Sequence, residues 1–548
     1  MAALLPRAPL SWLLLPLISG YLAADFLPNA PGFYAFSGLI LAFLALASIS
    51  SASPFFNQFW SISILLGGIF LAAGYLQVRL KPPAGWSHLP PREARLTISI
   101  DRLFSTSIEG GRISGLAKIR EAEGHLSDIT GRKIVFSLVP DKENRLWRRE
   151  TKLVCTGILE ALPEKPTDDF ERYLSRTGAQ FSYRTVTLRE EPEPGRGFFA
   201  FCDRQNQRFE QFLRAGTPEN ERAVGVYVAM LLGQRSQLDE KQERVYLISG
   251  AMHLFSISGL HIGVIAFSLH TLLTLLRLPP KAATVIGLLL LFIFVGIIGA
   301  PPSAIRAFIM AAFFWTAHFF VRVSNSVAAL ANSALFVLLL SPGLLWSTGF
   351  QLSYAVVTGI LLLGLPLGRH FQSKWTPFAG IPVQALGPMQ RGSSWLMRQL
   401  SGTLAISLSA TLLSSPLTIH YFGVFTAGAV LLNLLLIPLA SMVIVAGFIS
   451  LLLNLLMLAP LAVVFNHTGW VILIAMEKIT YASLTLPLFW SAEFPAPWVG
   501  PASLLSLIAV LLLCASQKWR APFFHFIIPF LLFVIVLLSA VRLTFPTD

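Results

Sequence analysis

The sequence has 548 residues, of which 54% are hydrophobic and only 13% charged. Soluble domains carry about 25% charged residues, so this composition excludes an ordinary soluble protein and indicates a membrane protein. The formal net charge is +13, and residues 80–220 hold 23 basic and 20 acidic side chains. Most of the excess positive charge therefore lies outside this segment.

Three apolar runs open the chain, at about 8–26, 31–49 and 57–79. Each has about the length that a bilayer-spanning helix requires. Arg7 before the first run is also typical of a signal peptide, but two further apolar runs follow directly, which favours a retained span. We expect residues 1–79 to form N-terminal transmembrane helices.

Residues 80–195 are charged and contain short alternating runs separated by Gly-rich turn signals, a pattern typical of β-strands. Five such strands with one helical piece at about 167–176 predict a small OB-like β-barrel. The expected strands are Leu96–Leu103, Arg112–Ile119, Lys133–Leu138, Lys152–Leu159 and Ser182–Leu188.

OB folds bind single strands through a basic groove with stacking aromatic side chains. The insert offers a matching set, which we expect at its surface as a DNA contact. For Phe136 and Phe181 the alternative, that the ring belongs to the barrel core, is favoured. The expected contacts are Arg145, Trp147, Arg148, Arg149, Lys152 and Tyr183.

Cys155 and Cys202 both lie in the part expected outside the cytoplasm, where a disulfide is permitted. Sequence does not decide between a bond and two free thiols. Cys514 lies in an apolar run and is expected to be a small apolar filler.

Residues 196–249 predict amphipathic connecting helices, with helix starts at Thr217 and at Ser236-x-x-Asp239. These helices would lie on the membrane surface or pack against the bundle. Residues 250–543 follow as the transmembrane domain, giving about 11–13 spans in all; residues 425–438 could instead form a re-entrant segment. The expected spans are 250–276, 281–300, 302–321, 325–341, 345–366, 402–423, 439–457, 463–485, 500–517 and 521–543.

Basic residues in the loops predict the orientation, because Lys and Arg are enriched on the cytoplasmic side. Arg7 places the N-terminus inside, so the insert lies outside and the C-terminus outside. A basic loop of about thirty residues, Arg369–Arg398, falls on the inside.

Between Glu243 and Glu477 the sequence contains no Asp or Glu, although it contains several Lys and Arg. The positive-inside rule explains most of the basic residues but not the missing acids. A path for a polyanion would favour their absence, since a buried carboxylate repels each passing phosphate.

The segment 250–263, GAMHLFSISGLHIG, interleaves small and hydroxyl residues with two histidines inside an apolar run. Polar groups at this depth usually face the bundle or a watery path. No nearby acid or cysteine supports a metal site or a Ser/His catalytic pair. The alternative is helix packing, with His253 and His261 hydrogen-bonded to backbone.

Several stretches of this chain resemble the ComEC competence proteins, inner-membrane channels for DNA uptake. The stretches are LLGQRSQL (231–238), GAMHLFSISGLHIG, APPSAIRAFIM (300–310), GFQLSYAVVTGI (349–360) and LLNLLLIPLAS (431–441). The insert also resembles the family's OB-type domain through its DFERYL segment, residues 169–174, although the usual Asn-Pro-Gly-Gly before it is replaced.

The resemblance implies a channel for single-stranded DNA in the bacterial inner membrane. Arg306, in the middle of an apolar run, would be a phosphate contact; alone it would be read as a residue snorkelling near a helix end. Asn433 and Pro438 would mark a broken helix along the path. The implied path residues are His253, Ser256, Ser258, Gly259, His261, Arg306, Gln351, Ser353, Asn433 and Pro438.

Many family members continue into a metallo-β-lactamase-like domain with an HxHxDH motif, which none of the ten histidines matches. No Walker A loop is present either. We therefore expect no enzyme activity, cofactor or metal, and expect partners: a DNA receptor outside, a separate nuclease, and a cytoplasmic motor or single-strand-binding protein. The alternatives are a transporter for another anionic solute or lipid, and a membrane-embedded enzyme, which the acid-free stretch disfavours.

Overall fold

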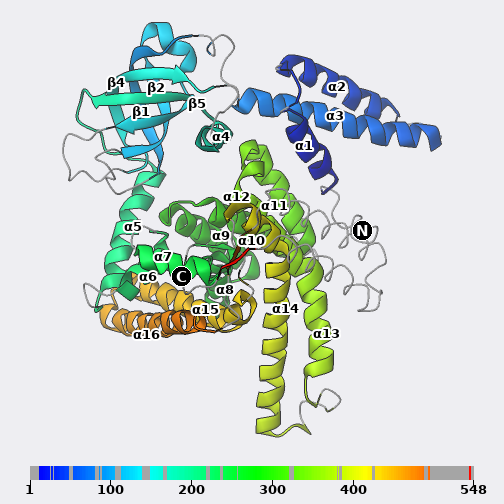
Figure 1. Cartoon of the computed structure of the whole chain (residues 1–548), viewed down its shortest axis with the longest axis vertical. Coiled ribbons are helices and arrows are strands. Elements are labelled where there is room, and N and C mark those ends of the chain that lie inside the picture. The colour runs from blue at the N-terminus through cyan, green and yellow to red at the C-terminus, as the bar shows by residue number, and fades with distance from the viewer. Residues whose placement is uncertain are drawn as a thin grey trace. The chain divides into compact units, whose positions relative to one another are not determined.

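The computed structural model of the chain divides into two compact units (Figure 1). The barrel unit comprises residues 9–206 and 331–347, and the bundle unit comprises residues 207–330 and 348–548. The residues that the structure describes are 11–24, 26–28, 30–48, 54–80, 86, 89–104, 113–138, 148–163, 169–217, 222–234, 239–255, 257–319, 326–378, 381, 385–422, 426, 428–486, 491–493 and 542–544.

The insert is a closed five-stranded barrel with strand order β1-β2-β3-β5-β4, in which β1 also pairs with β4. Only β3 and β5 pair in parallel; the other neighbours are antiparallel. This confirms the expected OB-like barrel, and each expected strand has its counterpart. The strands are β1 (Arg92–Leu103), β2 (Ile113–Ala122), β3 (Lys133–Leu138), β4 (Lys152–Ala161) and β5 (Ala179–Leu188).

Alternation along the strands builds the barrel core, because successive side chains point to opposite faces. On β1, Leu96, Ile98 and Ile100 are all buried. Gly115 on β2 is required by close approach, since a Cβ there would overlap the backbone oxygen of Arg102. Trp86 adds its ring edge-on to Phe181 at 5.0 Å and donates to Asp128 Oδ2 at 2.7 Å.

Three expected features of the insert take definite positions in this core. Phe136 and Phe181 are fully buried, which is the favoured alternative. Tyr183, expected at the surface, is also fully buried, and its hydroxyl lies 2.8 Å from Ala94 O and 2.9 Å from Cys155 O. Its place on an inward-facing position of β5 explains the difference.

Cys155 and Cys202 are both free thiols and both buried. Cys155 belongs to the barrel core, whereas Cys202 lies on α5 (Phe198–Arg214). Of the two alternatives, a disulfide or two free thiols, the structure therefore shows the free thiols. Cys514 lies outside the described residues.

The barrel unit also contains the first three apolar helices, α1 (Ser11–Ala24), α2 (Pro31–Ser48) and α3 (Pro54–Leu80). The last carbonyls of α11 (Ser326–Leu340), which have no partner within their own helix, accept hydrogen bonds from these helices. Tyr21 donates to Leu338 O at 3.0 Å and Arg79 to Leu340 O at 3.0 Å. Between β4 and β5 lies α4 (Asp169–Arg176), at the place expected for a helix.

The bundle unit is almost entirely helical. Across both units, six of the described helices are long and apolar enough to cross a bilayer, and six shorter ones are apolar, which confirms a multi-pass membrane protein. The spans expected at 500–517 and 521–543 lie outside the described residues. The helices of the bundle are α6 (Arg222–Leu232), α7 (Glu240–Ile248), α8 (Gly259–Leu275), α9 (Pro280–Ile297), α10 (Pro302–Phe319), α12 (Thr348–Gly359), α13 (Leu365–Trp375), α14 (Pro388–Phe422), α15 (Ala429–Leu455) and α16 (Ala459–Ser483), with a short π-helix, η7 (Ile360–Gly364), between α12 and α13. Two short helices, η4 (Gly124–Ile129) and η6 (Pro342–Trp346), belong to the barrel unit.

Of the two placements expected for the connecting helices, α6 has the second, packing against the bundle. Every residue of α6 after Arg222 is buried, so this helix packs within the bundle, against α15 and α16. The start of α7 is capped by Asp239, with Gln242 completing a reciprocal capping box; Ser236 lies outside the described residues.

Two expected irregularities are regular helix. The helix α15 runs without a break through Pro438, so neither the re-entrant segment nor the broken helix is observed. Helices in bundles tolerate proline because neighbouring helices and hydroxyl side chains support the freed backbone groups. The basic loop expected after the span at 345–366 is instead largely a helical hairpin, formed by α13 and the first turns of α14.

Burial raises the pKa of the Cys155 thiol to about 12 and also raises that of Cys202. Thiolate is the reactive form and an ordinary cysteine has a pKa of about 8.5, so both thiols should be protonated and inert at pH 8. In full-length protein carrying Cys514→Ser, maleimide should label neither thiol natively and both after denaturation without reductant, as read by mass spectrometry. Denatured, unreduced protein with no reactive thiol would instead reveal a disulfide.

Candidate site among the bundle helices

The segment before α8 is a loop, and the helix begins at Gly259 rather than Gly250. Ser258 caps it in a capping box with His261. His261 Nδ1 lies 3.3 Å from Ser258 N and 2.9 Å from Ser258 Oγ. Two of the N–H groups at this helix start are thereby satisfied. His261 is buried, and its Nε2 has no hydrogen-bond partner.

This loop is held against its neighbours at three points. Gly250 has φ +73°, a conformation that favours glycine, and a Cβ there would lie 2.8 Å from Ala429 on α15. Thr426 donates to Ile248 O at 2.6 Å, and Ser303 on α10 donates to Ile257 O at 2.9 Å. The start of α8 is therefore fixed beside the start of α10.

Arg306 on α10 is the largest fully buried side chain among the described residues. One guanidinium nitrogen donates to Gly349 O at 2.7 Å, at the start of α12. The other terminal nitrogen, Nη1, and Nε have no hydrogen-bond partner. A buried cation usually requires a carboxylate or several acceptors, and the sequence offers no acid between Glu243 and Glu477.

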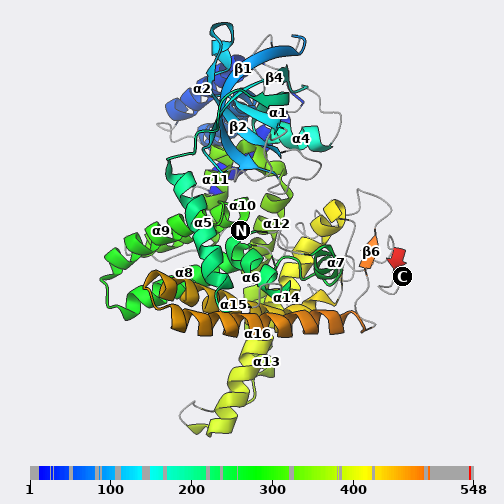
Figure 2. The ribbon, with the colours of Figure 1, turned by 90° about the vertical axis from the view of Figure 1, so that its left-hand side faces the viewer.

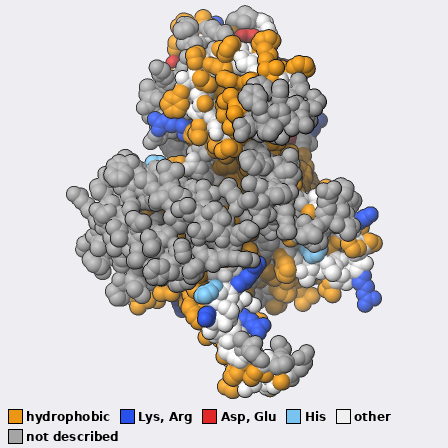
Figure 3. All heavy atoms as spheres, turned by 90° about the vertical axis from the view of Figure 1, so that its right-hand side faces the viewer, with side chains coloured by type: hydrophobic (Ala, Val, Ile, Leu, Met, Phe, Trp, Pro, Cys, Tyr) orange, Lys and Arg blue, Asp and Glu red, His pale blue; other side chains and the backbone are white. Residues whose placement is uncertain are grey.

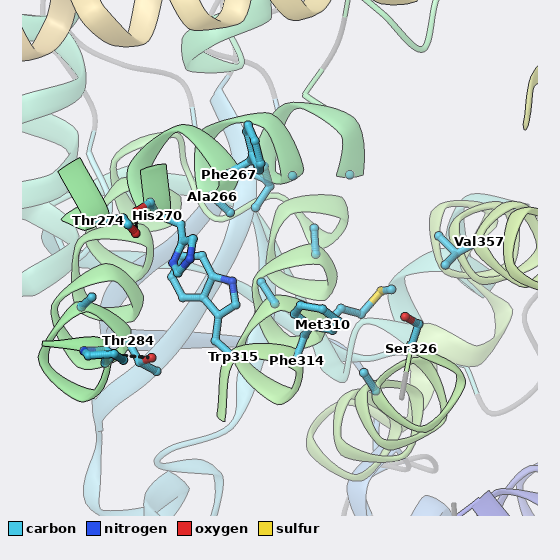
Figure 4. Close-up of a pocket in the computed structure, with 18 of the residues that line it drawn as sticks. Ala266, Phe267, His270, Thr274, Thr284, Met310, Phe314, Trp315, Ser326 and Val357 are labelled. Carbon is cyan, nitrogen blue, oxygen red and sulfur yellow. Dashed lines mark hydrogen bonds between the residues drawn. The ribbon is translucent and has the colours of Figure 1, made fainter. Parts of the chain in front are cut away.

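A cavity of about 1070 Å³ lies between α8, α9, α10, α11 and α12 (Figure 4). Most of its lining is apolar, and Figure 4 shows the His270 and Trp315 rings lying together on one side of it; their centroids are 5.6 Å apart. Gly259 and Ser353, two of the expected path residues, both line this cavity.

Arg306 and Gly349 do not line the cavity; on α10 and α12 they precede the first lining residues, Ala307 and Ser353, and so lie toward one end of it. On α10, the lining residue Met310 follows Arg306 by one turn, and on α12, the lining residue Ser353 follows Gly349 by one turn. Residues four apart share a helix face. Gly259, the first residue of α8, also lines the cavity.

The starts of three helices therefore meet at this end: α8 at Gly259, α10 at Pro302 and α12 at Thr348. A helix N-terminus carries partial positive charge and points backbone N–H groups outward. Together with Arg306, these three ends make a positively polarised, acid-free region beside one end of the apolar cavity, which we call the positive end. Such a place can hold an anion.

Some expected path residues lie elsewhere. Asn433 is buried on α15 and its Oδ1 has no partner, whereas Pro438 is exposed on the same helix. His253 is exposed, with Nδ1 3.1 Å from Gly250 O, and Ser256 lies outside the described residues. Gln351 accepts a hydrogen bond from the Tyr421 hydroxyl at 2.7 Å.

The basic residues expected to bind DNA on the barrel are partly engaged with acids. Arg149 pairs with Asp203 at 2.5 Å, with only 13% of its side chain exposed. Lys152 lies 3.9 Å from Glu193, and Arg148 is half-buried. Arg145 and Trp147 lie outside the described residues. DNA binding by this set stays a prediction.

Sequence reasoning missed the residues that hold the site together. Ser303 and Gly349 both fall within the stretches singled out earlier, yet nothing in the sequence shows that one bonds Ile257 and the other accepts from Arg306. The pairing of His270 with Trp315 was equally invisible. Within the described ranges, no group of three metal-ligating side chains occurs.

Replacing Arg306 with Met tests whether this buried charge serves packing. Exchanging an under-paired buried ion for an apolar side chain is often neutral or stabilising by about 1–4 kcal/mol, so Arg306→Met should melt at the same temperature or higher. Thermal unfolding in nanodiscs measures this. Ser303→Ala is the control and should cost about 1 kcal/mol through its lost hydrogen bond. A large loss of stability in Arg306→Met would assign the arginine to packing.

Comparison with known proteins relates this chain to one family and to two curated relatives. The family described as "Competence protein" matches residues 230–521, which include the whole candidate site. ComE operon protein 3 of Bacillus subtilis (strain 168) is 25% identical over 316 residues, covering 57% of this chain and 37% of the relative. An uncharacterized protein of Aquifex aeolicus (strain VF5) is 31% identical over 222 residues, covering 40% of this chain and 50% of the relative.

These alignments thus span half or less of each curated relative's length, and no solved structure matches the chain. The match to the family covers more than half of the chain and contains α8, α10 and α12. The chain belongs to the Competence protein family.

Proposed function

We propose that this protein is a channel that passes single-stranded DNA through the bacterial inner membrane into the cytoplasm during natural transformation. The observation that carries the proposal is the positive end of the bundle cavity. There a buried arginine and three helix N-termini lie together in a stretch that contains no acid. Membership of the Competence family makes DNA the favoured polyanion.

The physical argument concerns the passage of charge. Each phosphate carries a negative charge that an apolar environment disfavours strongly. The positive end offers a passing phosphate the unpartnered N–H groups of Arg306 and the dipoles of three helices. A single arginine suits transport, because conduction requires binding that is weak enough to release the cargo.

The barrel would guide or gate the strand before it enters the bundle. Its OB-like topology is one that often binds single strands. The proposed partners are a DNA receptor outside, a separate nuclease, and a cytoplasmic motor or single-strand-binding protein. In this proposal the chain itself is a passive conduit.

Deleting the gene in a transformable host should abolish DNA arrival in the cytoplasm while leaving uptake into the periplasm intact. Labelled DNA scored separately in the two compartments measures this. Normal arrival of DNA in the cytoplasm would contradict the proposed channel function. If DNA still reaches the cytoplasm but the transport of another anion is lost, the solute or lipid transporter is favoured.

In the same host, Arg306→Met should reduce cytoplasmic DNA entry at least tenfold at unchanged protein abundance, because a passing phosphate loses its charged partner. Arg306→Lys should restore part of the entry. Gln351→Ala should also reduce entry, because Gln351 lies near the start of α12, which forms part of the positive end. If entry falls only as far as protein abundance falls, the residues serve packing instead.

A further inference from the structure

The helices α13 and α14 continue far beyond the rest of the bundle unit as a hairpin (Figures 1 and 2). We call residues 368–401 of this hairpin the basic hairpin. From Met389 to Leu400 every residue of α14 is exposed except Ser394, so much of this stretch faces away from the rest of the described chain. The function proposed above does not use this element.

The length of α14 shows that the hairpin leaves the bilayer. Its 35 residues extend about 52 Å at 1.5 Å per residue, against a hydrocarbon core of about 30 Å. The apolar part, residues 402–422, fills that core alone. Trp395 then stands about 10 Å beyond the core, and Met389 about 20 Å, past a head-group layer of about 5–8 Å.

The hairpin is a rigid object. Gln372 on α13 donates to Arg398 O at 3.3 Å, and Ser394 donates to Pro377 O at 2.9 Å. A Cβ at Gly368 would lie 3.8 Å from the Cα of Gly402, so the two helices approach closely at the hairpin's base. These contacts therefore hold the two arms of the hairpin against each other.

The surface of the basic hairpin is positive and aromatic. Its four basic residues are Arg369, Lys374, Arg391 and Arg398, and the sequence places no acid there. Figure 3 shows basic and histidine side chains along the projection, with hydrophobic side chains at its tip. Trp395 is 63% exposed, and Trp375 is 47% exposed and stacks on Phe371 at 4.3 Å.

On α14 these properties form a stripe. Arg391, Trp395 and Arg398 are spaced four and three residues apart, so they share one helix face, and all three side chains are exposed. Exposed aromatic rings between positive groups are the elements with which proteins bind single strands, through base stacking and phosphate attraction.

We propose that the basic hairpin is a binding platform for single-stranded DNA, with Trp395 stacking on a base and Arg391 and Arg398 contacting phosphates. The inference rests on the proposed function, and it adds a second contact for the strand outside the membrane helices. Lys and Arg enrichment places the hairpin on the cytoplasmic side, where the strand would emerge.

Two other occupants fit less well. The anionic membrane surface also attracts basic and Trp-rich segments, but Trp395 and Arg391 stand beyond the head-group layer. An acidic protein would match the charge, but it gives no reason for flat aromatic rings to stand exposed between the arginines. Both remain outcomes of the test.

The test uses the full chain in nanodiscs of neutral lipid and a fluorescent oligo-dT followed by anisotropy. Trp395→Ala should weaken binding about tenfold, the loss of one stacked base. Arg391→Gln and Arg398→Gln should each flatten the salt dependence by about 0.7 in log–log slope, one phosphate contact apiece on a single strand. Leu396→Ala, which removes an adjacent exposed side chain, is the matched control and should bind normally.

Equal affinities for Trp395→Ala, Leu396→Ala and the unaltered protein would overturn the platform. So would a dye on Trp395→Cys, in a Cys514→Ser background, that responds to anionic nanodiscs and not to oligo-dT, since the hairpin would then bind lipid. Oligo-dT anisotropy of the hairpin variants tests the platform, whereas the arrival of labelled DNA in the cytoplasm tests the channel. The platform and the channel can therefore fail separately.

Discussion

The candidate site is built around a buried guanidinium that has no carboxylate to balance it. Taking a cation out of water costs several kcal/mol even after relaxation, and Arg306 recovers part of this through one hydrogen bond to Gly349 O. That bond ties α10 to α12, while Ser303 ties α10 to the loop before α8. The same contacts that hold the charge bring three helix starts together. The buried charge that lowers the stability of the fold is therefore also the group best placed to bind a phosphate.

The chain thus combines three regions with different relations to a polyanion. The barrel has a closed core and a mixed surface, on which Arg149 is already paired with Asp203. The cavity is apolar along its length and positive at one end. The basic hairpin carries arginines and exposed tryptophan with no acid. The last two regions carry positive charge in a stretch of sequence that contains no acid, and both lie in the segment that matches the Competence family.

Much of the fold could be predicted, because it follows local pattern. Period-two alternation gave all five strands of the barrel, and β3 has the expected bounds. The site was harder. The isolation of Arg306 was visible in the sequence, but its partner is a backbone oxygen at Gly349, which has no sequence signature. Pro438 predicted a break because proline removes a helical hydrogen bond, but α15 runs through it without a break. Tyr183 failed as a surface residue because an aromatic ring fits either face of a strand.

Contact between the strand and the cavity is the most direct test of the central claim. A photo-crosslinking amino acid at Ser353, which lines the cavity, should capture a labelled incoming strand during transformation. The same amino acid at Leu289, a 56% exposed position on α9, is the control and should capture none. Capture at Ser353 alone is the predicted result. No capture at Ser353 in cells that import DNA, or equal capture at both positions, would contradict a DNA path through this cavity.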